Sequence, residues 1–263
     1  MNDKRTLIVG NWKMNLNVSQ ASLLLHRLQE RIRISNDIEV VLAPSMLVLQ
    51  PLSIRLDRRK FRLAAQNALD KDEGAYTGEV SFAMLRELVH YVIIGHSERR
   101  IYFNETLPII CNKVAACVRN EITPILCVGE TKEERKNGET KQVLHDQVST
   151  ALADLTAREV QDIVIAYEPV WAISTFGGIL AKPHEIQVEM AYIRDQVKLL
   201  YGPKAAKSVR ILYGGSVDDQ IAPGYLAIPG CDGVLVGGAS INYHKFSGIT
   251  DAAYRLNRTP ESL

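Results

Sequence analysis

The chain has 263 residues, of which 46% are hydrophobic and 23% are charged, and its formal net charge at pH 7 is +1. These values lie close to the averages of globular proteins, so the composition excludes a disordered chain and a coiled coil. The balanced charge offers no basic excess for a nucleic acid, whereas a small anionic substrate would need only a local positive site.

Cysteine usage and the first residues of the chain indicate where the protein works. The four cysteines form no Cys-x-x-Cys pair, which argues against a disulfide framework and a zinc site. The first six residues are largely polar and precede only a short apolar run, so no secretory signal is expected. The longest uncharged stretch, residues 40–54, contains two prolines and is too short to span a membrane. We expect a cytoplasmic protein with no membrane segment, metal or cofactor.

Short apolar runs rich in Val, Ile and Leu recur along the chain and are typical of parallel strands buried on both faces. In chain order they are residues 7–9, 40–43, 63–65, 92–94, 125–128, 163–166, 211–213 and 234–236. Between them, apolar residues at helical spacing predict helices near residues 21–32, 80–89, 111–118, 139–155, 183–201 and 241–256, with shorter helices after Ser45 and Val217.

This alternation predicts an α/β fold with a parallel sheet. Eight strands and about as many helices in one chain favour closure into a single (β/α)8 barrel, and we predict one domain over residues 1–263. An open, doubly wound sheet is the alternative, but its Gly-x-Gly-x-x-Gly fingerprint is missing after the first strand.

In such a barrel the functional site lies at the carboxyl ends of the strands. The last two predicted strands each end in a glycine pair, Gly214-Gly215 and Gly237-Gly238, with Ser216 and Ser240 beside them. Unobstructed backbone N–H groups at a helix start can hold an anion. One such pair alone is more often a tight turn, but two in adjacent loops predict a phosphate site.

Polar residues also follow three other strands. Glu168 stands between an apolar run and a proline, and removal from water makes a carboxylate a better general base. A strand-end ion pair is its plain structural alternative. His96 begins a short helical stretch, where the helix N-terminus favours a neutral imidazole that donates a hydrogen bond; a purely structural histidine is the alternative.

Two residues after the first strand complete this set. Lys13 could neutralise substrate charge, and Asn11 could donate to a developing oxyanion. Taken one at a time, both would pass as ordinary surface residues. Together with Glu168, His96 and the phosphate site, they indicate proton transfer on a carbon next to a carbonyl in a phosphorylated substrate.

The sequence from Gly10 to about Asp251 resembles the triosephosphate isomerase family. The motifs that carry the resemblance occur in the family's order; they are Gly10-Asn-Trp-Lys-Met-Asn15, Ala65-Gln-Asn67, Gly74-Ala-Tyr-Thr-Gly-Glu79, Ile94-Gly-His-Ser-Glu-Arg-Arg100, Ile125-Leu-Cys-Val-Gly-Glu130, Ala166-Tyr-Glu-Pro-Val-Trp-Ala172, Tyr213-Gly-Gly-Ser-Val217 and Leu235-Val-Gly-Gly-Ala-Ser240.

The resemblance implies a TIM barrel that interconverts dihydroxyacetone phosphate and D-glyceraldehyde 3-phosphate through an enediol(ate). By motif position Glu168 is the base, His96 the neutral electrophile, and Asn11 and Lys13 the groups that bind oxygen and stabilise charge. The implied phosphate-binding positions include Asn11, Lys13, Ser174, Ser216, Gly237 and Gly238. Ile173 and Leu235 match an apolar pair that clamps the base.

The resemblance also implies a homodimer. The loop from Gly74 to Glu79 matches a segment that docks on the partner subunit, and Thr77 matches the residue that reaches into the partner's site. No nucleic-acid or membrane partner is expected.

The lid is where the chain departs from the family's pattern. Ser174 and Phe176 stand where glycines are usual, Gly177 replaces a lysine, and about two extra residues precede Pro183. We expect the segment from Ser174 to Ala181 to close with a hinge shifted toward its second half, and Phe176 to pack over the closed site.

Two other functions fit the residues. Another phosphate-binding barrel isomerase or epimerase would share the two glycine-rich loops but would not need His96 beside Glu168. A catalytically silent barrel that serves as a binding protein would keep the core and lose the chemical positions, all of which are occupied here.

Overall fold

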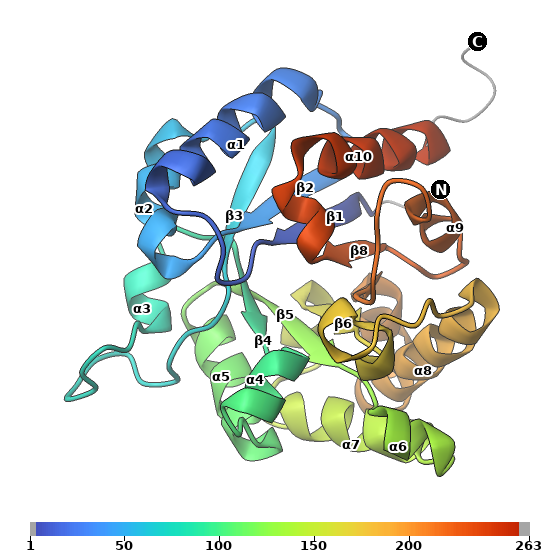
Figure 1. Ribbon diagram of the computed structural model, residues 1–263. Helices are drawn as coiled ribbons and strands as arrows, with labels where there is room; N and C mark the ends of the chain where they lie inside the picture. Colours follow the sequence, from blue (N-terminus) through green and yellow to red (C-terminus); the bar gives the residue numbers. More distant parts are fainter. Residues whose placement is uncertain (1–3, 258–263) are drawn as a thin grey trace.

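The computed structural model describes residues 4–257 of the chain. Its strands form a closed barrel in which each strand pairs with its neighbours in sequence, and every pairing is parallel (Figure 1). The strands are β1 (Thr6–Asn11), β2 (Ile38–Ala43), β3 (Phe61–Ala65), β4 (Tyr91–Ile94), β5 (Thr123–Val128), β6 (Val164–Tyr167), β7 (Arg210–Tyr213) and β8 (Gly233–Val236). The predicted barrel is confirmed, and each strand includes most of the run that predicted it.

Closure of the barrel explains why the strand runs are continuously apolar. Side chains alternate across a strand, so Leu7 and Val9 of β1 lie in a cluster inside the barrel, whereas Ile8 lies in the cluster between strands and helices. All three are fully buried. The two faces of each strand therefore both require apolar residues.

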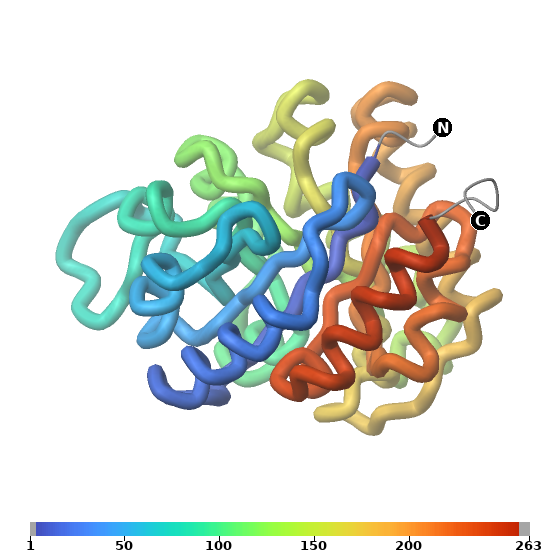
Figure 2. The backbone as a smooth tube through the Cα atoms, turned by 90° about the horizontal axis from the view of Figure 1, so that it is seen from above, coloured from blue at the N-terminus to red at the C-terminus, as the bar shows by residue number. Residues whose placement is uncertain are grey.

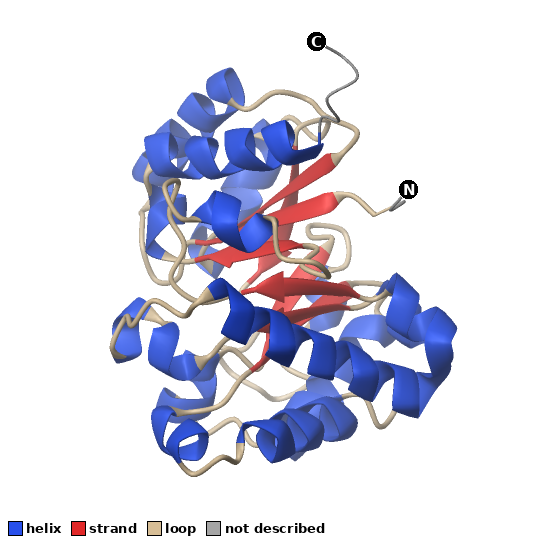
Figure 3. Cartoon of the chain, turned by 90° about the vertical axis from the view of Figure 1, so that its right-hand side faces the viewer, coloured by secondary structure: helices blue, strands red, loops and turns tan. Residues whose placement is uncertain are grey.

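Helices surround the strands on the outside of the barrel (Figure 3). They are α1 (Val18–Arg31), α2 (Met46–Arg55), α3 (Phe82–Leu85), α4 (Ser97–Tyr102), α5 (Leu107–Arg119), α6 (Lys132–Lys136), α7 (Thr140–Ala151), α8 (Pro183–Ser208), α9 (Ala222–Leu226) and α10 (Tyr243–Asn257). Short 3-10 helices are η1 (Glu159–Asp162), η2 (Val170–Ala172), η3 (Ser174–Phe176) and η4 (Gly238–Ile241). No helix in this described part is long and apolar enough to cross a membrane.

Several helices differ from their predicted bounds: α5 begins at Leu107, α7 ends at Ala151, and three others differ for a visible reason. The helix expected over residues 80–89 is only α3, because the chain turns after Leu85 to deliver β4. The helix expected after Val217 begins at α9, because Asp218 first accepts the backbone N–H groups of the next turn. The α8 segment continues to Ser208 across a break at Gly202, whose φ of 86° is left-handed.

One segment projects from the barrel. Figures 1 and 2 both show the chain between β3 and α3 extending outward as a long loop. Residues 71–79 of this loop are exposed. Residues 74–79, which the sequence assigns to a subunit contact, thus form the outer part of a protruding arm.

Candidate active site

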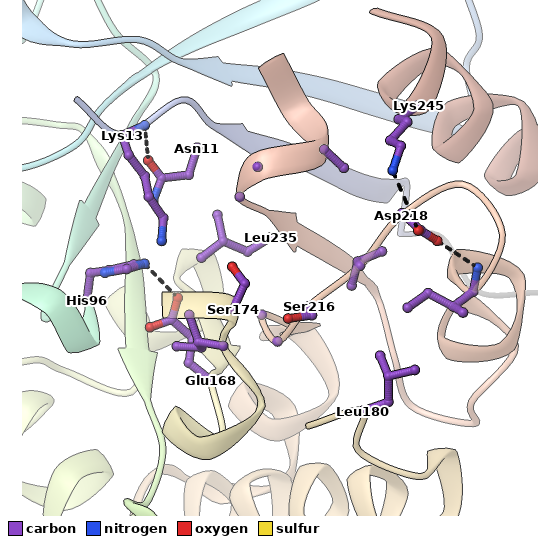
Figure 4. Close-up of a pocket in the computed structure, with 18 residues that line it drawn as sticks. Asn11, Lys13, His96, Glu168, Ser174, Leu180, Ser216, Asp218, Leu235 and Lys245 are labelled. Atoms are coloured by element: carbon purple, nitrogen blue, oxygen red, sulfur yellow. Dashed lines mark hydrogen bonds and ion pairs between the residues drawn. The ribbon is translucent and has the colours of Figure 1, made fainter. Parts of the chain in front are cut away.

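All eight residues that the sequence predicts for the site line one pocket of about 270 Å³ at the carboxyl ends of the strands (Figure 4). They are Asn11, Lys13, His96, Glu168, Ser174, Ser216, Gly237 and Gly238. Ile173 and Leu235, the predicted apolar pair, line the same pocket. The barrel brings these residues together because each lies at or shortly after the carboxyl end of a strand, and these ends open on one face.

Glu168 is held in place at the end of β6. Its backbone N–H donates to Val128 O at 2.7 Å, and its side chain is 2% exposed. Carboxylate Oε1 lies 3.2 Å from Nε2 of His96, and Oε2 accepts the backbone N–H of Ser97 at 3.4 Å. A Cβ at Gly214 would lie 2.7 Å from the Glu168 Cγ. The loop after β7 thus needs glycine at position 214 to leave room for the carboxylate.

His96 is the N-cap of α4, and its ring orientation follows from that position. Its Nδ1 accepts the backbone N–H of Glu98 at 3.2 Å. A ring nitrogen that accepts carries no proton, so this arrangement corresponds to a neutral imidazole with its proton on Nε2. That Nε2–H points toward Glu168 (Figure 4). The helix start therefore selects the tautomer that donates into the pocket.

Lys13 occupies a left-handed backbone position, with φ of 52°, immediately after β1. The Asn11 Oδ1 accepts the Lys13 backbone N–H at 3.1 Å, and the Gln66 side chain donates to the Lys13 carbonyl at 2.8 Å. A left-handed conformation is unfavourable for a lysine. These hydrogen bonds offset that cost and direct the ammonium group into the pocket.

Glu98 is a site residue that the sequence reasoning missed. Its Oε1 lies 2.5 Å from the Lys13 Nζ and accepts the Thr175 hydroxyl at 3.1 Å. Burial acts to raise the pKa of Glu98, but hydrogen bonds from Lys13 and Thr175 and the charge of Lys13 lower it overall. The sequence could have indicated Glu98, because it stands two residues after His96 in the same motif.

The other half of the pocket consists of the two glycine loops. A Cβ at Gly215 would lie 2.1 Å from the Tyr213 hydroxyl oxygen, so the close approach requires glycine. Ser216 donates through both its backbone N–H and its Oγ to Ala172 O, at 3.1 and 2.7 Å. Gly238 begins η4, and the Ser240 Oγ donates to Gly237 O at 2.6 Å. This half offers backbone N–H groups at a short helical turn.

The lid lies against α4 in this structure. Thr175 of η3 donates to Glu98, and the Phe176 ring lies 5.8 Å from the Tyr102 ring, centroid to centroid. Phe176 does not line the pocket, although its lid neighbours Ser174 and Leu180 do. The expectation that Phe176 covers a closed, occupied site therefore stays a prediction.

Two of the cysteines are completely buried, and burial decides the state of their thiols. Burial raises the pKa of the Cys117 and Cys127 thiols well above the ordinary value, so both are protonated at neutral pH. Within residues 4–257, no cluster of three or more His, Cys, Asp or Glu side chains could hold a metal ion.

Comparison with known proteins decides the family. Residues 6–253 match the protein family described as Triosephosphate isomerase. The chain is 45% identical over 255 residues to the Triosephosphate isomerase of Chloroherpeton thalassium, an alignment that covers 95% of this chain and 99% of that protein. This chain belongs to the triosephosphate isomerase family.

Other members of the family show a similar relationship. Identity to the Triosephosphate isomerase of Clostridium tetani is 41% over 249 residues, covering 94% of this chain and 96% of that protein. Identity to the Triosephosphate isomerase of Trichlorobacter lovleyi is 42% over 244 residues, covering 92% and 96%. The family predicted from the sequence motifs is thus confirmed over nearly the whole chain.

Proposed function

We propose that Glu168 is the general base of an aldose–ketose isomerase, with His96, Asn11 and Lys13 as the groups that stabilise charge on oxygen. The activity is that of the family, the interconversion of dihydroxyacetone phosphate and D-glyceraldehyde 3-phosphate. The observation that carries the assignment of roles is the 3.2 Å contact between two buried side chains, Glu168 and His96, in a pocket that also contains the glycine loops.

The reaction follows from these positions. Glu168 removes a proton from the carbon next to the carbonyl, and the C–H electron pair forms the carbon–carbon double bond of an enediolate. The carbonyl electrons move to oxygen, where the Nε2–H of His96, the Lys13 ammonium and the Asn11 amide stabilise the negative charge. A proton passes from the hydroxyl oxygen on the neighbouring carbon to the former carbonyl oxygen. Glu168 delivers its own proton to the former carbonyl carbon as the other oxygen becomes the new carbonyl, which completes the isomerisation.

The phosphate group is assigned to the opposite half of the pocket. Ser174, Ser216, Gly237 and Gly238 line that half. A helical turn with unobstructed amides favours a dianion. Phosphate at this end would place the three-carbon chain between the glycine loops and Glu168.

The deciding experiment is an assay of the purified chain with D-glyceraldehyde 3-phosphate, coupled to reduction of the dihydroxyacetone phosphate formed. We expect rapid turnover of this triose and none of a pentose phosphate. Turnover of the pentose instead would favour the other phosphate-binding isomerases or epimerases. Binding of both without turnover would favour a silent barrel.

We also propose that the chain is a homodimer. A second hollow of about 390 Å³ adjoins the active site, and its lining includes Asn11, Lys13, His96 and Glu98. Exposed apolar side chains lie beside or within it, among them Met14, which is 94% exposed, and Phe103. We assign the arm of residues 74–79 of a second copy to this hollow, where Thr77 would approach His96.

Sedimentation during turnover tests the dimer. Replacing residues 74–79 by a short glycine linker removes the arm, and we expect a monomer with lower activity, because Lys13 and His96 lose their neighbour. The exposed loop residue Lys71→Ala, outside the arm, is the control. A fully active monomer at assay concentration would contradict the proposal.

The remaining assignments concern organisation and location. We propose that the chain works as one domain, needs no cofactor and acts in the cytoplasm. All four cysteines are unpaired thiols, which suits a reducing compartment. Activity that survives a chelator and dialysis would support the metal-free, cofactor-free mechanism.

A further inference from the structure

The pocket contains a second lysine that the sequence analysis did not identify. Lys245 of α10 lines it together with Asp218 and Ile221, at the end away from His96 and Glu168 (Figure 4). The nearest strand-end motif is five residues earlier in the chain. The helix α10 begins on the carboxyl face of the barrel, directly after η4, and its first turn brings the Lys245 ammonium group to the pocket.

The two lysines of the pocket are bound very differently. Lys13 Nζ lies 2.5 Å from its carboxylate partner, and both side chains are 22% exposed. Lys245 Nζ lies 3.9 Å from the Asp218 Oδ2, with side chains 49% and 35% exposed. A loose, hydrated pair of this kind contributes little free energy. Lys245 can therefore exchange its partner at small cost, whereas Lys13 is committed to Glu98.

Asp218 has a second task that fixes its position. Its Oδ1 accepts the backbone N–H groups of Gln220 and Ile221, at 3.0 and 3.2 Å. The carboxylate therefore stays with the turn that leads into α9, and the lysine is the movable member of the pair. An anion that reaches this end of the pocket competes with one weakly bound carboxylate.

The surrounding groups define which anion fits. Gly237 and Gly238 line the same half of the pocket as Lys245, and so does Ser216, whose backbone N–H and hydroxyl donate to Ala172 O in this structure. A phosphate dianion carries more charge than the single carboxylate of Asp218 and accepts several hydrogen bonds at once. It should therefore attract the ammonium group more strongly than Asp218 does.

We propose that Lys245 is a recognition residue for the phosphate group of the substrate. When the dianion binds, the Lys245 ammonium group moves away from Asp218 and pairs with the phosphate. This inference rests on the proposed function, because it concerns the same pocket. Lys245 does not reach the reacting carbons. It therefore helps to capture and hold the substrate and takes no part in the proton transfer.

The test is Lys245→Met, which keeps most of the side-chain volume and removes the charge. We expect KM for D-glyceraldehyde 3-phosphate and the inhibition constant of inorganic phosphate each to rise about three- to tenfold, and kcat to change much less. The fall of kcat/KM with added salt should also become shallower, because one attractive charge is gone. Lys245→Arg should restore both constants.

Two further variants separate this role from general effects. Lys204→Met removes the same charge from an exposed position in α8, at the opposite end of the barrel, and we expect it to leave both constants unchanged. Asp218→Asn keeps an oxygen for the turn and removes the competing charge, so phosphate should inhibit more strongly. This gain should vanish when Lys245→Met is added.

The proposal is overturned if Lys245→Met keeps the original KM and inhibition constant, or if Lys204→Met changes them as much. Calorimetry of phosphate binding distinguishes failure of this proposal from failure of the proposed function. An unaltered chain that binds phosphate through Lys245 but does not isomerise the triose would contradict only the proposed function.

Discussion

The two halves of the active-site pocket are constructed in different ways. In the catalytic half, Asn11, His96 and Glu168 are all less than 8% exposed and are held by backbone hydrogen bonds at strand ends and a helix start. The other half combines the glycine loops with the lid residues Ser174, which is exposed, and Leu180, which is 57% exposed. The chemistry is thus preorganised, while capture and closure depend on contacts that can be exchanged.

The largest effect is expected from shortening the base. Glu168→Asp shortens the side chain by one methylene, and the fixed end of β6 cannot move forward to bring the carboxylate back to the substrate. We expect kcat to fall about 10³-fold while KM changes little, because the lost contact acts in the transition state. The coupled assay measures this, with a thermal melt to verify folding. A variant that keeps most of its kcat would exclude Glu168 as the base.

The next effect separates two members of the catalytic half. His96→Gln should lower kcat about 10²-fold while inorganic phosphate still inhibits normally, because the ring acts on the reacting oxygen. Lys13→Ala should weaken phosphate inhibition as well, since its charge acts on the whole substrate. Inhibition constants for both variants provide the measurement. Equal loss of inhibitor affinity in the two would show that their roles are not distinct.

Glu98 connects the catalytic half of the pocket to the lid, because it binds Lys13 in the first and Thr175 in the second. Its lowered pKa means that its contribution to stability is complete above its ordinary value of 4.5 and is lost as pH falls through the lower, folded value. The destabilisation caused by Glu98→Gln should therefore be largest above pH 4.5 and shrink below it.

Chemical denaturation across this pH range measures that difference. The exposed Glu87→Gln controls for the loss of one carboxylate. If the free energy of unfolding of Glu98→Gln differs from that of the original chain by a constant amount through the acid range, the assigned pairing is contradicted.

The smallest effect is expected in the lid. The contact between Phe176 and Tyr102 holds the lid on α4, and aromatic pairs contribute roughly 0.5–1.5 kcal/mol. Phe176→Ala should therefore ease closure and lower KM by about two- to tenfold. Tyr102→Leu should act in the same direction. A rise in KM for Phe176→Ala would show instead that the ring packs over the bound substrate.

Much of this structure could be predicted from the sequence, because local residue patterns indicate the strands and the residues that follow them. Continuous apolar runs reported strands buried on both faces, and polar or glycine residues directly after them reported the carboxyl rim. Asn11, Lys13, His96 and Glu168 each stand within a few residues of a strand, so their convergence followed from the closed barrel alone. Fold, family and the positions that we propose for catalysis could therefore be predicted from the sequence.

What the sequence could not supply are contacts between residues far apart in the chain whose side chains choose their own direction. Glu98 could have faced solvent, and only the fold brings it to both Lys13 and Thr175. Phe176 lies on Tyr102 and Lys245 on Asp218 because of how the lid and α10 pack against their neighbours. Such pairings depend on the relative placement of whole elements, which no local pattern encodes, and so only the tertiary structure decided them.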